Sequence, residues 1–197
     1  MESSKELIAA QNEVQAQIGR NLLNYQIIEG RMKAILMLGN LEVKRNVDGR
    51  LTSNTSSQWK TLGNLFRDYI TDHVEISTET ISAELEADSI LPEGILLRVK
   101  FTEHFESAEH LAEWDILLKQ LSKDRNELVH HFFQRFKMNS LENCREALGH
   151  LKLRRDFSAM PFDKLRNILL GLHESYQEFN NILASDNFFD TNQDITH

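Results

Sequence analysis

Apolar side chains spaced three to four residues apart dominate this sequence, and this spacing restricts the chain to a mostly helical fold. The longest such stretch runs from about Glu2 to Leu41 and predicts one long helix, with bends allowed at Gly19 and Gly30. A helix of this length is longer than a small bundle. Its first turns are therefore expected either to pack on another chain or to form the solvated start of a core helix. Four further segments show the same spacing: 59–73, 107–136, 140–155 and 161–183. The sequence therefore predicts an all-α bundle of four to five helices.

Three segments differ from this pattern. Residues 43–58 are rich in Ser, Thr and Asn and are predicted to form a mobile loop. Residues 75–105 alternate over short distances around Pro92, which predicts either a small β-hairpin or an extended insertion with helical pieces. Residues 186–197 are polar and are expected to form a flexible C-terminal tail. A chain of 197 residues suffices for one core, so we expect a single helical domain over residues 1–185.

Local capping signals set the expected helix boundaries. Ser107 is expected to cap the helix that follows it, and Asn139 or Ser140 the next one. Pro161 is expected in the first turn of the last helix, where its missing N–H would have no partner in any case. His73 falls at the end of its predicted helix, where the helix dipole favours a cation.

The charge and cysteine content of the chain limit its class. The net charge of −8 argues against a dedicated nucleic-acid coat, because non-specific affinity comes from neutralising phosphates. An acidic body still accommodates a nuclease with a local basic groove. Cys144 is the single cysteine, which rules out an internal disulfide and indicates a reducing compartment. We expect it to be a small core residue.

Targeting and cofactor motifs are absent from the sequence. The first residues lack the basic and apolar regions of a signal peptide. The longest apolar run, Ala34 to Leu38, falls far short of the roughly 20 residues that span a bilayer. We therefore expect a cytoplasmic protein without a membrane partner. There is no glycine-rich phosphate loop, no His-Glu-x-x-His helix and no paired-cysteine pattern, so no metal or cofactor is expected.

One charged residue interrupts the apolar stripe of the predicted central helix. Arg125 lies within roughly 60° of four apolar positions on a regular helix: Leu118, Leu121, Leu128 and Phe132. An unpaired buried guanidinium costs several kcal/mol. Either the helix breaks near this residue, or Arg125 faces a cleft in which it has a function.

The residues next to Arg125 favour a break. Asp124 suits an N-cap, and Glu127 follows three residues later, so the two form a variant capping box. Arg125 and Asn126 would then lie in the first turn of a new helix, where free N–H groups favour an anion. His130 follows roughly 140° around a regular helix from Arg125. The two side chains would converge only on a ligand held beside the helix start, with a second copy able to complete the site.

The letters Arg-Asn-Glu-Leu-Val-His-His-Phe at 125–132 resemble the motif of the HEPN superfamily. Its members are bundles of four to five helices and include RNA-cleaving toxins and nuclease domains of antiviral effectors. The motif is an Arg, often followed by a polar residue, with four to six residues before a His; four residues separate Arg125 from His130. Pairs of similar spacing elsewhere lie within ordinary amphipathic patterns: Arg145 with His150, and Arg166 with His173.

The resemblance implies metal-independent cleavage of RNA in which the 2′-hydroxyl is the nucleophile. Arg125 would hold the scissile phosphate, Asn126 would orient the phosphate or the His, and His130 would transfer a proton. RNA is therefore the expected partner. One site supplies one His, whereas acid–base cleavage needs two proton-transfer groups, so we also expect a homodimer in which the two motifs face each other. A toxin, defence or stress RNase with an antitoxin or regulatory protein is the implied context.

One position departs from the pattern of HEPN toxins that pair with a nucleotidyltransferase antitoxin. In those toxins a Tyr follows the His after one residue, and its hydroxyl can be adenylylated. The corresponding residue is Phe132, so nucleotide transfer to this side chain is chemically excluded.

Additional cations are candidates for contacts with the RNA backbone: His131, Lys123, Lys152, Arg154 and Arg155. The last three belong to the most concentrated positive charge in the chain, where the alternative is a solvated helix end. Two other classes of function remain open. A non-catalytic HEPN-like module would bind RNA, a nucleotide or a protein partner. A structural helical protein would instead pair Arg125 with a carboxylate of Asp124, Glu127 or Asp115.

Overall fold

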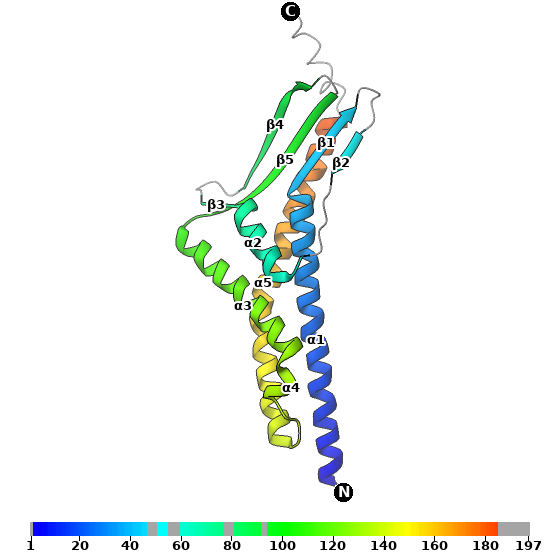
Figure 1. The fold of residues 1–197 in the computed structure, drawn as a ribbon, viewed down its shortest axis with the longest axis vertical. Coiled ribbons are helices and arrows are strands. Elements are labelled where there is room, and N and C mark those ends of the chain that lie inside the picture. Colours follow the sequence, from blue (N-terminus) through cyan, green and yellow to red (C-terminus); the bar gives the residue numbers. More distant parts are fainter. Residues whose placement is uncertain (1, 47–50, 55–59, 77–80, 92–93, 185–197) are drawn as a thin grey trace, which may run out of the picture.

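Two long helices form the frame of the molecule. The computed structural model describes residues 2–46, 51–54, 60–76, 81–91 and 94–184. Helices α1 (Glu2–Leu38) and α5 (Leu141–Ala184) run side by side along the long axis, as Figure 1 shows. The two helices run in the same direction. Hydrogen bonds from side chains to backbone carbonyls connect them, and later residues of α1 are joined to later residues of α5. Three of these bonds are Asn21 to Leu151, Arg31 to Phe162 and Tyr176 to Leu38.

The prediction of one long N-terminal helix is confirmed. Helix α1 continues through Gly19 and Gly30, and its buried side chains lie on one face, including Val14, Ile28 and Ile35 at 0% exposure. Its N-terminal half packs in a core cluster of its own chain, formed with α4 and α5. The first turns of α1 therefore pack on their own chain along the buried face, as the start of a core helix.

Three shorter helices complete the helical part. Helix α2 (Leu62–His73) lies beside α3 (Ala108–His130). The short helix α4 (Phe132–Arg135) follows α3 in the chain. The buried residues of α2 are Leu62, Leu65, Phe66, Tyr69 and His73. The prediction of a mostly helical chain with four to five helices is confirmed, since the described residues form five helices.

Two helix-start predictions are confirmed and one is wrong. Ser107 accepts a hydrogen bond from the His110 backbone N–H at 3.2 Å, and Ser140 accepts one from the Asn143 backbone N–H at 3.2 Å. Pro161, however, lies inside α5 rather than in its first turn. Its side chain is fully buried, so packing outweighs the lost backbone hydrogen bond.

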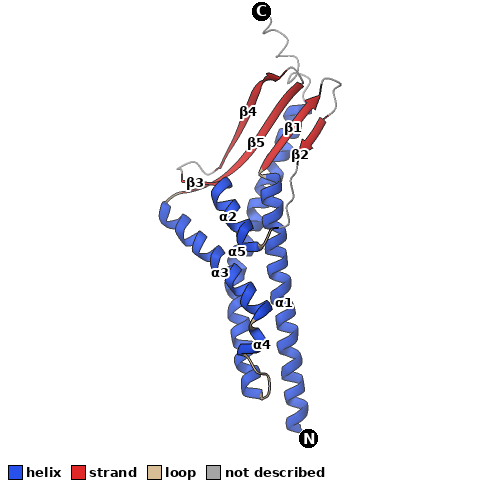
Figure 2. Cartoon of the chain, in the orientation of Figure 1, coloured by secondary structure: helices blue, strands red, loops and turns tan. Residues whose placement is uncertain are grey.

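A five-stranded sheet covers the end of the bundle opposite the N-terminus (Figure 2). Its strands are β1 (Asn40–Asn46), β2 (Leu51–Asn54), β3 (Val74–Ile76), β4 (Ile81–Leu91) and β5 (Gly94–Phe105). The central strand β5 pairs antiparallel with β1 and β4 and parallel with β3. The β-hairpin predicted within 75–105 is confirmed as β4 and β5, but the sheet is larger than a hairpin.

The predicted loop over residues 43–58 is wrong where the structure describes it. Residues 43–46 belong to β1 and residues 51–54 to β2, which pair with each other. Polar residues can occupy strands when the backbone completes a sheet ladder, because strand propensity depends on context. The rest of that segment, and the predicted tail over 186–197, lie outside the described residues.

His73 lies at the joint between the helices and the sheet. Its ring is fully buried, and its Nδ1 lies 2.9 Å from the Phe101 carbonyl oxygen. A Cβ at Gly39 would come within 2.6 Å of this ring, so the chain needs glycine there as it passes from α1 to β1. Burial lowers the pKa of His73. The expectation of a cation stabilised by the end of α2 is therefore wrong, because the ring is a neutral core group.

Candidate functional site

Helix α3 positions the motif residues, and it is continuous. It runs from Ala108 to His130, so the break predicted at Asp124 is wrong. Asp124 is 3% exposed; its Oδ1 accepts hydrogen bonds from Arg154 on α5 and from Gln120. The capping signal at Asp124 was local, whereas the partner that holds this carboxylate is 30 residues away.

The second acid of the motif is also held by arginines. Glu127 accepts a hydrogen bond from Arg135 at 2.5 Å, and its other oxygen lies 3.6 Å from Arg154. Burial raises the pKa of Glu127, but the hydrogen bond and positive charge of Arg135, together with Arg154, more than offset this and the pKa is lowered. The Arg154 guanidinium is thus paired with Asp124 and Glu127, and its contact with the RNA backbone stays a prediction.

Two further polar groups border this cluster of Asp124, Glu127, Arg135 and Arg154. Burial lowers the pKa of His150, and the positive charges of Arg154 and Arg135 add to the effect. Burial, with the nearby Asp124 carboxylate, raises the pKa of Tyr25. The ion pairs of the cluster thus join α3 to α4 and to α5.

Among the described residues, no carboxylate forms an ion pair with Arg125. Its side chain is half-buried, and its Nη1 donates a hydrogen bond to Asn126 Oδ1 at 3.2 Å. The carboxylates that could have neutralised it have other partners: Asp124 holds Arg154, Glu127 holds Arg135 and Asp115 holds Lys119. An ion-paired, purely structural Arg125 is therefore not what the structure shows.

Three polar side chains lie on one exposed face of α3. Lys123, Asn126 and His130 are all exposed and lie within roughly 60° of one another around the helix axis. Arg125 is roughly 140° from His130, so one chain does not place these two on one face. Its hydrogen bond to Asn126 directs the guanidinium toward the exposed face.

The remaining predicted contacts are dispersed. His131 ends α3 and begins α4, and its ring lies edge-on to His130 with centroids 6.2 Å apart. Lys152 and Arg155 are exposed, and Arg155 lies 3.4 Å from Asp156. Lys152 and Arg155 lie inside α5, in its first third, rather than at a helix end. The structure does not join them to the motif face by any contact among the described residues.

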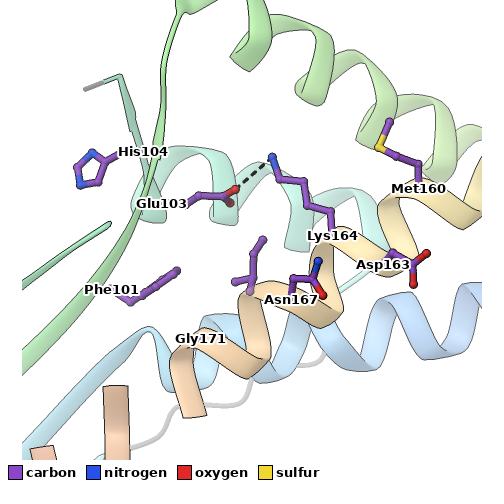
Figure 3. A pocket seen from close by; sticks show the side chains of 9 residues that line it. Phe101, Glu103, His104, Met160, Asp163, Lys164, Asn167 and Gly171 are labelled. Atoms are coloured by element: carbon purple, nitrogen blue, oxygen red, sulfur yellow. Dashed lines mark ion pairs between the residues drawn. The ribbon is translucent and has the colours of Figure 1, made fainter. Parts of the chain in front are cut away.

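Two hollows lie in the described part of the molecule, and neither is lined by Arg125 or His130. A groove of about 500 Å³ between α2 and α3 is lined by Arg67, Lys119 and Ser122 among others. A second hollow of about 690 Å³ lies between β5 and α5 and is shown in Figure 3. Its wall carries an ion pair of 3.1 Å between Glu103 and Lys164.

The pair of Glu103 and Lys164 was missed by the sequence analysis. Burial raises the pKa of Glu103, and the charge of Lys164 opposes the rise. The Lys164 ammonium also lies over the rings of Phe105 and Trp114, at 3.9 and 4.3 Å from their centroids. The burial of Glu103 could have been predicted from the sequence, because residues two apart in a strand lie on the same face. Glu103 lies midway between Phe101 and Phe105, which are both buried.

Among the described residues, no three or more His, Cys, Asp and Glu side chains are grouped so that they could hold a metal ion. None of the described helices combines the length and apolar character that crossing a membrane requires. Comparison with protein-family models, with curated proteins and with solved structures gave no match.

Proposed function

We propose that this chain is a metal-independent endoribonuclease of HEPN type, with its site on the exposed face of the last turns of α3. The observation that carries the proposal is the arrangement of charge around the motif. Both carboxylates, Asp124 and Glu127, are neutralised by arginines from other helices. Arg125 makes no ion pair within the described residues, and His130 is exposed. The motif therefore offers cations and a proton-transfer group without a competing acid.

The proposed reaction uses the RNA's own hydroxyl. His130 takes the proton of the 2′-hydroxyl, the 2′-oxygen attacks phosphorus, and the P–O5′ bond breaks. The leaving 5′-oxygen takes a proton from a second acid, and the products are a 2′,3′-cyclic phosphate and a free 5′-hydroxyl. Arg125 offsets the charge that develops on the phosphoryl oxygens, while Asn126 holds the guanidinium and Lys123 contacts the backbone.

A second copy of the chain supplies the second proton-transfer group. One chain carries one motif His on this face, and Arg125 lies roughly 140° away from it. Two large apolar side chains lie exposed beside His130: Val129 at 44% and Phe133 at 60%. They provide apolar surface for a homodimer in which both motifs face one cleft. In a cytoplasmic toxin or defence setting, a regulatory protein would compete for the same surface.

A non-catalytic binding module is the second candidate. The observation that favours it is the divergence of Arg125 and His130 on an unbroken helix. Such a module would bind RNA, a nucleotide or a protein partner through the same face. It would bind without producing cleaved RNA.

The test is cleavage of single-stranded RNA in the presence of EDTA. We expect wild-type protein to cut the RNA, and we expect Arg125→Ala and His130→Ala each to reduce the rate at least 100-fold. The matched controls are Arg166→Ala and His173→Ala, two exposed residues of similar spacing on α5, which should cut at the wild-type rate. Loss of activity in the controls as well, or RNA binding without any cutting by wild type, would contradict the nuclease.

A further inference from the structure

The hollow between β5 and α5 has the size of a small-molecule site. Its volume is about 690 Å³, and sites for small molecules measure roughly 300 to 1,000 Å³. Figure 3 shows residues from both of its walls: Phe101 and Glu103 on β5, and Lys164, Asn167 and Gly171 on α5. A ligand in this hollow would therefore be held between the sheet and the last helix.

Apolar side chains form much of the inner surface of the hollow. Phe101 on β5 is 5% exposed, and Ile168 on α5 packs against the same core cluster. Met160 also lines the hollow and is 57% exposed. Covering apolar surface that faces water is favourable. These residues thus provide a surface for the apolar body of a ligand.

An ion pair lies in the same wall. Glu103 and Lys164 are 3.1 Å apart, and their side chains are 14% and 30% exposed. The second carboxylate oxygen of Glu103, Oε2, is buried and has no hydrogen-bond partner among the described residues. Removing two charges from water without complete hydrogen bonding is unfavourable compared with apolar side chains. A pair of this kind beside a hollow indicates a role in binding.

The charges around the hollow favour a neutral ligand. Because Glu103 and Lys164 compensate each other, a charged ligand would be attracted by one and repelled by the other. The Asp163 carboxylate is 62% exposed and lies 4.0 Å from Arg166, so its charge is screened. The Asn167 amide is exposed and offers both a donor and an acceptor. Its complement is a group in which a donor lies beside an acceptor.

We propose that the hollow binds a small neutral molecule with an apolar body and an amide-like edge. The body covers Phe101 and Ile168, the edge forms hydrogen bonds with the Asn167 amide, and its dipole lies beside the pair of Glu103 and Lys164. Amides and the hydrogen-bonding edges of nucleobases belong to this class. The site is separate from the motif on α3 and does not depend on the proposed nuclease.

Three probes that share a ring test the class of ligand: benzamide, benzoate and benzamidinium. Their binding to the whole ¹⁵N-labelled chain is measured by chemical-shift titration. We expect benzamide to bind about tenfold more tightly than either ion, and to shift the amide signals of residues 101–104 and 163–171. Equal or tighter binding of an ion, shifts confined to other residues, or no binding at millimolar concentration would overturn the proposal.

A glycine in the wall allows the hollow to be filled. A Cβ added at Gly171 would meet nothing within 4 Å, so the side chain of Gly171→Leu extends into the open space and should weaken benzamide binding by at least about tenfold. Gly149 on α5 has equally open surroundings but does not line the hollow, so Gly149→Leu should bind as wild type. Both substitutions favour the helix, and circular dichroism checks the fold. Unchanged binding by Gly171→Leu would place the ligand elsewhere.

A change of charge tests the contact with the amide. Asn167→Asp alters an exposed side chain of the same shape and should weaken benzamide binding while strengthening that of benzamidinium. Asn180→Asp, at another exposed position on α5, is the control for added charge and should change neither. An unchanged order of the three probes in Asn167→Asp would show that the ligand edge does not contact this amide.

Discussion

At the scale of single residues, the site depends on how each charge is compensated. The buried Asp124 carboxylate forms an ion pair with Arg154, and Gln120 donates a hydrogen bond to the same carboxylate oxygen. Arg125 lies one residue further along α3 and has an amide as its partner instead of an acid. Arg154 on α5 is therefore held in ion pairs, whereas Arg125 on α3 makes none among the described residues.

Removal of Asp124 should therefore be costly. Asp124→Ala leaves the Arg154 guanidinium without its buried partner, and we expect the free energy of unfolding to fall by about 3 kcal/mol. Asp156→Ala, which removes an exposed carboxylate from α5, should change it by less than about 0.5 kcal/mol. Urea denaturation of the three proteins measures both values. Equal effects of the two substitutions would show that the Asp124 pair does not hold the bundle.

His73 predicts a dependence of stability on pH. Burial lowers its pKa from 6.5, so below that pH the unfolded chain binds a proton that the folded chain does not. The free energy of unfolding should therefore be highest above the unfolded pKa of 6.5 and should decrease as the pH falls below it, by up to about 1.4 kcal/mol per pH unit. His73→Gln keeps an N–H for the Phe101 carbonyl and should show a shallower decline. Parallel curves for the two proteins would contradict this assignment.

At the scale of elements, the helix starts were predictable and the helix continuations were not. Ser107 and Ser140 cap through groups only three residues away, so the local sequence contains the necessary information. Asp124 carries a similar local signal, but a partner on α5 overrides it. Pro161 likewise suggested a helix start, yet it lies fully buried inside the continuous helix α5.

The cap of α3 can be tested directly. Ser107→Ala removes the acceptor of the His110 N–H and should lower the free energy of unfolding by about 1 kcal/mol. Thr61 occupies the same position at the start of α2 but makes no side-chain capping bond. Thr61→Ala should therefore have little effect under the same conditions. A larger loss for Thr61→Ala than for Ser107→Ala would reverse the assignment of the caps.

At the scale of the whole molecule, two parallel long helices carry a helical bundle at one end and a sheet at the other (Figure 2). Helical periodicity predicted α1 as one long helix, but it predicted two separate helices, over 140–155 and 161–183, where the structure has the continuous α5. The sheet beyond the predicted hairpin was missed because β1 and β2 contain polar residues that pair through their backbones. Helical periodicity carries no information on the proposed association of motif residues from two copies.

The nuclease assignment is tested most directly by the chemistry of the cut. An RNA oligonucleotide and a copy with one 2′-deoxy nucleotide at the cut position are incubated with the protein in EDTA, and the product ends are identified by mass spectrometry. We predict that wild type cuts the RNA to give a 2′,3′-cyclic phosphate and a 5′-hydroxyl, leaves the deoxy position intact, and loses this activity in His130→Ala. Cleavage at the deoxy position, or equal cleavage by His130→Ala, would contradict a site at the end of α3.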